Sequence, residues 1–254
     1  MQQPDLAVII LAAGKGSRMQ TSLAKVLLPV AGRPLLHYVL DLASRLNPAR
    51  TIVVVGHQAD QVRKTFADRE VEFVVQREQL GTGHATQQAK EELKNFEGSV
   101  FVLCGDMPLI RSKTLLLMLE GHKRSGAKCT ILTLKSSGCH DFGRIIRDRK
   151  GSILKIVELK DASEVEKKVD EFNSGVYCFD NKLFFKALEN ISPNNSQKEY
   201  YLTDTIEYLV QSGYPVQAIQ INDANEILGI NSPDDLGRAV RLLEIGRASC
   251  SERV

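Results

Sequence analysis

The sequence predicts an α/β protein with a mostly parallel central sheet and a small β lobe. Short aliphatic runs alternate with amphipathic stretches over the first half of the chain, as they do in parallel βαβ units. In the second half, strand-like runs follow one another directly, which indicates hairpins. With 254 residues, 43% of them hydrophobic, the chain is long enough to bury a sizeable core.

The predicted strands are rich in β-branched and aliphatic residues and are bounded by turn-forming residues. They cover residues 6–12, 51–56, 71–76, 99–106, 128–134, 144–148, 153–159, 174–179 and 216–221. The segment Arg149-Lys150-Gly151-Ser152 separates two of these runs and is typical of a hairpin turn. The hairpin predicts a lobe that is added to the parallel sheet.

Amphipathic periodicity predicts helices between the strands. Residues 33–46 place Leu36, Val39, Leu40, Ala43 and Leu46 on one face. The stretch 112–126 ends in a glycine suited to a helix C-terminus.

The expected domain organisation is simple. Residues 1–231 are expected to form one compact domain, with the β lobe at roughly 140–200. A helix follows at 232–245, with Ser232 as its N-cap and Pro233 at its first position. Residues 246–254 have no hydrophobic period, and we interpret them as a possible cloning scar or truncation point.

Composition excludes several classes of protein. The formal net charge of +2 argues against a nucleic-acid binder that works by bulk electrostatics. The five cysteines form no CxxC pair, so neither a zinc site nor a disulfide framework is indicated. No stretch approaches the roughly 20 apolar residues of a membrane helix, and the N-terminus lacks the pattern of a signal peptide. We therefore expect a cytoplasmic protein with no membrane partner.

The loop after the first strand is suited to an anion. In "VIILAAGKGSRM" (8–19), small residues remove side-chain bulk where the strand ends, namely Ala12, Ala13, Gly14 and Gly16. Backbone N–H groups can then close around a phosphate. Lys15 and Arg18 add positive charge. The alternative is a tight strand-to-helix turn with two solvated cations.

Two common phosphate loops do not fit. A dinucleotide fingerprint needs a third glycine where Met19 stands, and an acid at the end of the second strand, which here ends in Gly56-His57-Gln58. A Walker A loop needs a Gly-Lys-Ser/Thr that closes a longer loop. Neither an NAD site nor a P-loop is predicted.

Further motifs resolve the loop's assignment. Besides the first loop, the chain contains "LAKVLLPVAGRPLL" (23–36), "QREQLGTGHA" (76–85), "VLCGDMPLI" (102–110) and "EYYLTD" (199–204). From Val8 to about Leu243 the chain closely resembles the uridylyltransferase domains of the bacterial GlmU family, within the sugar nucleotidyltransferases. The resemblance implies a Rossmann-like nucleotide-diphospho-sugar transferase fold. It also implies that UTP and N-acetylglucosamine 1-phosphate, with Mg²⁺, give pyrophosphate and UDP-N-acetylglucosamine, a cell-envelope precursor.

The resemblance also implies roles for charged residues. Asp106 and Asn231 match Mg²⁺ ligands, and carboxylate and amide oxygens suit this hard cation. Their alternatives are a helix N-cap for Asp106 and a turn amide for Asn231. Arg18 and Lys25 match residues that bind the triphosphate; solvated loop charges are the alternative. Together with Asp106 they are the expected catalytic residues.

The remaining implied contacts are to the base, the ribose and the sugar. Residues from Leu11 to Arg18 would hold the phosphates, with Ala12, Ala13 and Gly14 facing the base and ribose. Gln76, Gly81 and Thr82 match the segment that reads uracil, unless they form an ordinary surface loop. Gly143, Glu158 and Asn173 match sugar contacts in the lobe.

Cys104 is a departure from the resemblance. It precedes Gly105 and Asp106 where relatives often have tyrosine or serine, and a thiol donates only a weak hydrogen bond. Its part in substrate binding is therefore open. We do not expect Cys104 to be a catalytic thiol, because the sugar phosphate is itself the nucleophile and positioning and electrostatics carry the reaction.

Alternative functions remain open at this point. One is nucleotidyl transfer to another sugar 1-phosphate, or to a different phosphate such as methylerythritol phosphate. Another is a module that binds a UDP-sugar without turnover. The chain has no hexapeptide repeats of the kind that build the acetyl-coenzyme A domain of GlmU proteins. We therefore expect no acetyl transfer to glucosamine 1-phosphate, and a monomer or weak oligomer.

Overall fold

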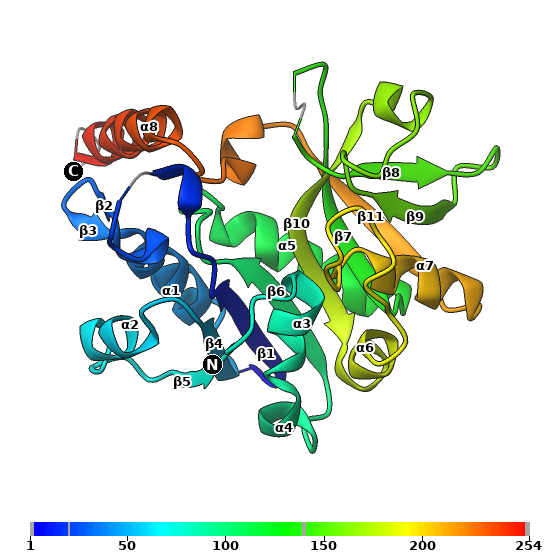
Figure 1. The fold of residues 1–254 in the computed structure, drawn as a ribbon, viewed down its shortest axis with the longest axis horizontal. Helices are drawn as coiled ribbons and strands as arrows, with labels where there is room; N and C mark the ends of the chain where they lie inside the picture. The colour runs from blue at the N-terminus through cyan, green and yellow to red at the C-terminus, as the bar shows by residue number, and fades with distance from the viewer. Residues whose placement is uncertain (1–2, 20, 139–140, 252–254) are drawn as a thin grey trace.

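A central sheet organises the molecule, in the strand order β11-β7-β10-β6-β1-β4-β5 (Figure 1). The structure is a computed structural model that describes residues 3–19, 21–138 and 141–251. The strands on this path are β1 (Gln3–Ala12), β4 (Pro48–Val55), β5 (Glu72–Val75), β6 (Ser99–Cys104), β7 (Cys129–Lys135), β10 (Glu171–Asp180) and β11 (Val216–Ile221). All of them overlap predicted strands, and β1, β4 and β10 each begin three residues before the predicted start.

The sheet is mostly parallel, as predicted. Strand β1 pairs in parallel with β4 and β6, β4 pairs in parallel with β5, and β11 pairs in parallel with β7. Only β10 runs against its neighbours β6 and β7 on this path. Because β4 and β6 flank β1 and run parallel to it, the carboxyl ends of these three strands lie at one edge of the sheet, which is where open α/β sheets bind ligands.

Alternation along β1 divides the core between the two faces of the sheet. Val8 and Ile10 pack into one buried cluster, and Ala7 and Ile9 pack into the other. The first cluster is covered by α1 (Leu35–Arg45), α2 (Ala59–Thr65) and α5 (Ser112–Ser125). The second is covered by α3 (Thr82–Gln87), α4 (Lys90–Leu93), α6 (Asn181–Leu188) and α7 (Asp204–Gln211). Burial on both faces explains why these strands are continuously apolar.

The two predicted internal helices are confirmed. Helix α1 buries its whole predicted apolar face, namely Leu36, Val39, Leu40, Ala43 and Leu46. Helix α5 ends at Ser125 and is followed by Gly126 in the left-handed region, at φ 67°.

The predicted β lobe begins as a hairpin beside the main sheet. Strands β8 (Arg144–Arg147) and β9 (Ile153–Val157) pair antiparallel, and β8 joins the sheet through β10 (Figure 1). The amide of Gly151 donates to the carbonyl of Asp148 in the turn, at 3.1 Å. Within the range 140–200, β10 lies in the main sheet and α6 covers that sheet.

Several short elements were not predicted, because their sequences show no hydrophobic period. A two-stranded sheet joins β2 (Pro29–Val30) to β3 (Arg33–Pro34). Its two prolines argue against a strand, because proline cannot donate to a ladder. The 3₁₀ turns are η1 (Ser17–Met19), η2 (Lys25–Leu27), η3 (Glu166–Lys168) and η4 (Ala224–Ile227).

The last helix begins where it was predicted but is longer. Helix α8 (Pro233–Ser251) continues past residue 245. The predicted end relied on the loss of apolar periodicity, but extending an existing helix needs no apolar face, and nothing after Gly246 breaks it. Its first half packs on the β2–β3 hairpin, where Val30, Ile230 and Ala239 share a small buried cluster.

Two further predictions concern the state of the cysteines and membrane-spanning helices. Cys104, Cys129 and Cys178 are free thiols; Cys139 and the side chain of Cys250 lie outside what the structure describes. Among the described residues, no helix combines the length and the apolar character required to cross a membrane.

Candidate active site

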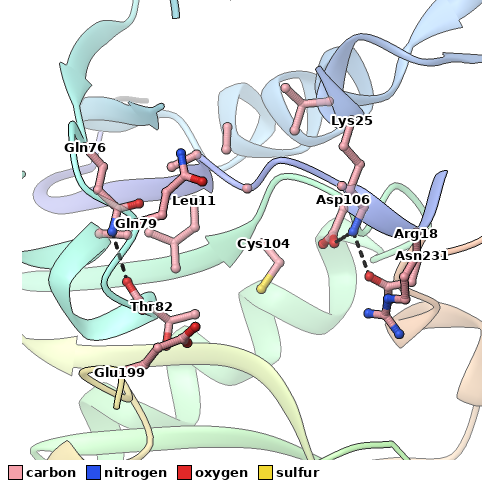
Figure 2. A pocket seen from close by; sticks show the side chains of 17 residues that line it. Leu11, Arg18, Lys25, Gln76, Gln79, Thr82, Cys104, Asp106, Glu199 and Asn231 are labelled. Carbon is pink, nitrogen blue, oxygen red and sulfur yellow. Dashed lines mark hydrogen bonds and ion pairs between the residues drawn. The ribbon is translucent and has the colours of Figure 1, made fainter. Parts of the chain in front are cut away.

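A cavity of about 370 Å³ opens at the carboxyl ends of β1 and β6 (Figure 2). It is lined by Leu11, Ala12, Ala13, Gly14, Gly16, Arg18, Lys25, Val26, Gln76, Gln79, Gly81, Thr82, Ala85, Cys104, Asp106, Glu199 and Asn231. The structure therefore brings together most of the predicted site residues. Lys15 is not among the lining residues, and its side chain is exposed.

A buried lysine joins two oxygen ligands at one end of the cavity. Lys25 Nζ donates to the carboxylate of Asp106, and it donates to Oδ1 of Asn231 at 2.8 Å. The Lys25 side chain is only 10% exposed and that of Asp106 is 25% exposed. Both oxygens therefore converge on a single cationic centre in a partly desolvated place. Arg18 lies at the same end, beside Asn231 (Figure 2).

The approach of the first loop to Lys25 depends on a glycine. Gly16 has φ 64°, and a Cβ built on it would lie 2.7 Å from Cβ of Lys25. Any other residue would be strained and would also push against the lysine stem. The glycine predicted to free backbone N–H groups thus has a second role here, because it lets the loop pack against Lys25.

The alternative reading of Asp106 as a helix N-cap is wrong. Helix α5 begins only at Ser112, and the N-cap position is taken by Arg111. The Asp106 carboxylate accepts from Lys25 instead. Pro108 lies between Asp106 and the helix, which is consistent with the delayed start.

The side chain of Asn231 is likewise not the cap of α8. The amide of Asp235 donates to Ser232 Oγ at 3.2 Å, and Asp235 Oδ2 accepts from the Ser232 amide at 2.8 Å. This reciprocal capping confirms Ser232 as the N-cap. Asp235 Oδ2 also accepts from the backbone of Asn231, which leaves the Asn231 side chain to Lys25.

The opposite end of the cavity is formed by Gln76 (Figure 2). This residue is 3% exposed, and its Nε2 donates to the carbonyl of Gly81 at 3.1 Å. The same nitrogen lies 3.0 Å from Nδ1 of His84. With its nitrogen committed to these neighbours, the amide presents its oxygen as the free hydrogen-bonding atom.

The motifs "QLGTGHA" and "EYYLTD" are adjacent in space. Gly81 has φ 105°, and a Cβ on it would lie 2.6 Å from the carbonyl of Tyr200. The Gly83 amide donates to that carbonyl, and the Tyr200 amide donates to the carbonyl of Leu80, both at 2.8 Å. Thr82 Oγ1 accepts from the amide of Leu202. The close fit explains the glycines and brings Glu199 to the cavity wall.

Cys104 lies between the two ends of the cavity (Figure 2). Burial raises the pKa of its thiol to about 12, so the thiolate is scarce near neutral pH. Its Sγ lies 3.6 Å from the carbonyl of Gly175, which is a weak contact. Gly105 is not among the lining residues. Its amide donates to the carbonyl of Leu11 and so joins the ends of β6 and β1.

The three predicted sugar contacts cluster together but do not line this cavity. The Asn173 amide donates to the carbonyl of Gly143 at 2.9 Å, and Glu158 accepts from Thr203 Oγ1 at 3.1 Å. Burial raises the pKa of the Glu158 carboxyl. Asn173 Oδ1 accepts from the Gly175 amide, and Gly175 contacts Cys104, so the cluster lies next to the cavity wall.

Some lining residues were missed by sequence reasoning. Gln79 and Glu199 lie inside motifs that the sequence marked out, but neither was assigned a role. Their positions within "QREQLGTGHA" and "EYYLTD" were the available signal. Val26 and Ala85 also lie inside quoted motifs, but they offer only apolar side chains, and residue type does not distinguish them from core residues.

Asp106 and Asn231 suit a hard cation. They offer a carboxylate and an amide oxygen, which are donors that Mg²⁺ accepts, and both already face one ammonium group. Within residues 3–19, 21–138 and 141–251, no cluster of three or more His, Cys, Asp or Glu side chains could hold a metal ion. A cation at Asp106 and Asn231 would therefore need further ligands from phosphate or water.

The chain is similar to curated proteins of known name. The chain is 45% identical over 235 residues to the bifunctional protein GlmU of Geobacillus thermodenitrificans, covering 92% of this chain and 51% of that protein. It is 47% identical over 236 residues to the GlmU of a Listeria monocytogenes serotype 4b strain, covering 93% and 51%. The GlmU of Pelobacter propionicus is 44% identical over 240 residues, covering 94% and 52%. The chain thus spans about half the length of these curated relatives.

Structural similarity supports the fold. A crystal structure of UDP-glucose pyrophosphorylase complexed with UDP-glucose superposes with a TM-score of 0.76 at 17% identity, covering 97% of this chain and 100% of that one. At that identity the likeness shows the α/β nucleotidyltransferase fold. The family model that describes the MobA-like NTP transferase domain matches residues 8–192. Because this family model matches most of its length, the chain belongs to the MobA-like NTP transferase domain family.

Proposed function

We propose that the chain transfers UMP from UTP to N-acetylglucosamine 1-phosphate, giving UDP-N-acetylglucosamine and pyrophosphate. The observation that carries the proposal is that one cavity has a charged end and an uncharged amide at its other end. One end gathers Lys25, Asp106 and Asn231, and the other holds the Gln76 amide. The similarity to bifunctional GlmU proteins supports this choice of nucleotide and sugar.

The reaction requires two polyanions to meet. A phosphate oxygen of the sugar attacks the α-phosphorus of UTP, a new P–O bond forms, and the bond to the departing pyrophosphate breaks in line. Lys25 and Arg18 offset negative charge at this place, and they bind and orient the triphosphate. The attacking phosphate is already ionised near neutral pH, so no side-chain nucleophile is needed.

Mg²⁺ is the proposed cofactor, held by Asp106 and Asn231. When bound, it would neutralise charge on the reacting phosphates. Lys25 donates to both residues and holds the carboxylate and the amide oxygen close together, where they would face the cation.

The proposed base site lies between Leu11 and Gln76. Ala12, Ala13 and Gly14 line the cavity without bulky side chains, and Gly81 and Thr82 line it as well. The Gln76 oxygen can accept from the ring N–H of uracil, because its own amide nitrogen is occupied by Gly81. This arrangement supports a preference for uracil.

The sugar is proposed to occupy the space next to Cys104, on the side of the lobe. The proposed sugar-binding residues there are Gly143, Glu158 and Asn173. Gly105, at the end of β6, is proposed to let the substrate come close to the backbone. The half-buried Glu158 offers a carboxylate acceptor for sugar hydroxyl groups.

The test is an assay of pyrophosphate release. Purified protein is mixed with Mg²⁺ and N-acetylglucosamine 1-phosphate, and UTP, CTP, GTP and dTTP are compared; the sugar phosphate is then exchanged for other hexose 1-phosphates and for methylerythritol phosphate. We expect release with UTP and N-acetylglucosamine 1-phosphate to exceed every other pair. Tight binding of UDP-N-acetylglucosamine without pyrophosphate release from any pair would instead identify a binding module.

A further inference from the structure

The turn that follows β4 holds both ends of the first loop. The amide of His57 donates to the carbonyl of Ala13 at 3.3 Å, close to where β1 ends. The next residue, Gln58, reaches the segment that precedes Lys25. The loop that carries Arg18 thus begins and finishes against the same short turn, although the turn itself does not line the cavity.

Gln58 makes a two-point contact with its side-chain amide. Oε1 accepts from the backbone amide of Ala24 at 2.7 Å, and Nε2 donates to the carbonyl of Ser22 at 2.6 Å. Both polar atoms of the side chain are therefore used, and both contacts are to backbone. A contact of this kind fixes the path of the segment and does not depend on which side chains the segment carries.

The backbone of Gln58 is unusual for a residue with a side chain. It has φ 54° and ψ 38°, in the left-handed region that favours glycine. Such a conformation persists when surrounding interactions compensate for it. The two bonds to Ser22 and Ala24 are interactions of this kind.

The clamped segment leads directly to Lys25. Ala24 is the residue before the 3₁₀ turn η2, which begins with Lys25. From there the lysine stem passes Gly16, and its ammonium reaches Asp106 and Asn231. A shift of the Ala24 backbone would move the start of the lysine side chain and misalign its contacts at the far end.

We propose that Gln58 is a positioning residue, which holds the Ser22–Ala24 backbone so that Lys25 meets Asp106, Asn231 and the triphosphate in one arrangement. It touches no substrate and acts through Lys25. The kinetic consequence rests on the proposed function, whereas the structural consequence does not.

The decisive variant is Gln58→Gly. Glycine accepts the left-handed backbone, so the turn is kept while the clamp is lost. We expect a melting temperature close to that of the unmodified protein and a KM for UTP raised about tenfold, with a smaller change in kcat. Gln58→Asn also tolerates this backbone but is one methylene shorter, and it should behave like Gln58→Gly. The matched control is Asn47→Gly, which changes another left-handed position (φ 50°) far from the cavity and should leave KM unchanged.

A second readout needs no turnover. Trypsin cleavage after Lys25, followed by mass spectrometry, measures how often this buried residue becomes accessible. We expect cleavage there to accelerate about tenfold in Gln58→Gly and not in Asn47→Gly. If the unmodified protein releases no pyrophosphate, the proposed function fails, and this arm still tests the clamp. Unchanged cleavage would overturn the proposal, as would faster cleavage with a KM for UTP within about twofold of the unmodified value.

Discussion

Lys25 Nζ lies 2.8 Å from Oδ1 of Asn231, although 206 positions separate the two residues. The same ammonium donates to Asp106, at the end of β6. The contact joins the first loop, the centre of the sheet and the segment before α8 at one point. This end of the cavity therefore forms only when all three segments are folded together.

Replacement of Asp106 by asparagine tests the cation site. Asp106→Asn keeps the size of the side chain but removes the charge that faces Lys25, so we expect kcat to fall at least about 100-fold at any Mg²⁺ concentration. The melting temperature should change little. Pyrophosphate release measured over a range of Mg²⁺ concentrations checks this. Asp234→Asn, an exposed acid in the first turn of α8, is the matched control and should keep full activity; near-native rates in Asp106→Asn would rule out the assignment.

Truncation of Gln76 tests the base site. Gln76→Ala removes the side-chain amide of a residue that is 3% exposed and whose Nε2 donates to Gly81, so the KM for UTP should rise about tenfold. The preference for UTP over GTP and ATP should narrow at the same time. Steady-state kinetics with the three nucleotides measures both effects. Gln61→Ala, an exposed amide on α2, provides the comparison; equal use of GTP and UTP by the unmodified protein would contradict a uracil site.

Asp204 makes stability depend on pH. Burial, and then the charges of Glu207, Glu158 and Asp161, raise the pKa of this carboxyl from 3.8 to about 6. A raised pKa means that the folded state binds the proton more tightly than the unfolded state does. The stabilisation is complete below pH 3.8 and is lost as the pH rises through about 6.

The corresponding variant is Asp204→Asn, which cannot ionise. Near pH 4 its free energy of unfolding should lie close to that of the unmodified protein. Above pH 7 it should be the more stable protein by roughly 1 kcal/mol, after discounting for solvent screening of a partly exposed group. Urea unfolding at both pH values measures the difference. Asp60→Asn, an exposed acid in the first turn of α2, should show no such trend, and a pH-independent difference for Asp204→Asn would disprove the explanation.

Glu226 stabilises the segment that leads to Asn231. It is 5% exposed, and its Oε2 accepts from Thr114 Oγ1 at 2.6 Å and from the Arg111 amide at 3.3 Å, at the start of α5. Glu226→Ala leaves these donors unpaired and should lower the free energy of unfolding by about 1–3 kcal/mol. Thermal and urea unfolding measure this. The control is Glu120→Ala, which removes an exposed carboxylate of α5 that contacts Arg124 at 3.8 Å, and it should lower the free energy of unfolding by less than about 1 kcal/mol. Equal losses in the two variants would argue against this role of Glu226.

Much of the fold could be predicted because its signals are local. Runs rich in aliphatic residues predict the strands of the main sheet. The spacing of apolar residues predicts α1 as a helix with one buried face. The reversed direction of β10 could not be predicted. Both a parallel and an antiparallel central strand are continuously apolar when they are buried on both faces, so composition does not distinguish them.

The candidate site divides in the same way. The residues of the glycine loop, the Lys25 segment, "QLGTGHA" and the strand end at Asp106 could be singled out because their motifs are contiguous, and the cavity contains residues from each of them. Gln58 gave no signal. Its importance comes from a left-handed backbone and two bonds to a segment 34 and 36 residues away, and neither property is written in the neighbouring sequence.

The amino-acid sequence by itself determined which segments become strands and helices and which residue types are available for phosphate, base and cation, because periodicity and residue chemistry act over a few neighbouring positions. Only the tertiary structure decided that Lys25 contacts Asp106 and Asn231. It also decided that the amide nitrogen of Gln76 donates to Gly81 and that Gln58 holds the segment before Lys25. These contacts depend on the order and direction of the strands. That order is set by the burial of both sheet faces across the whole chain, which no local pattern encodes.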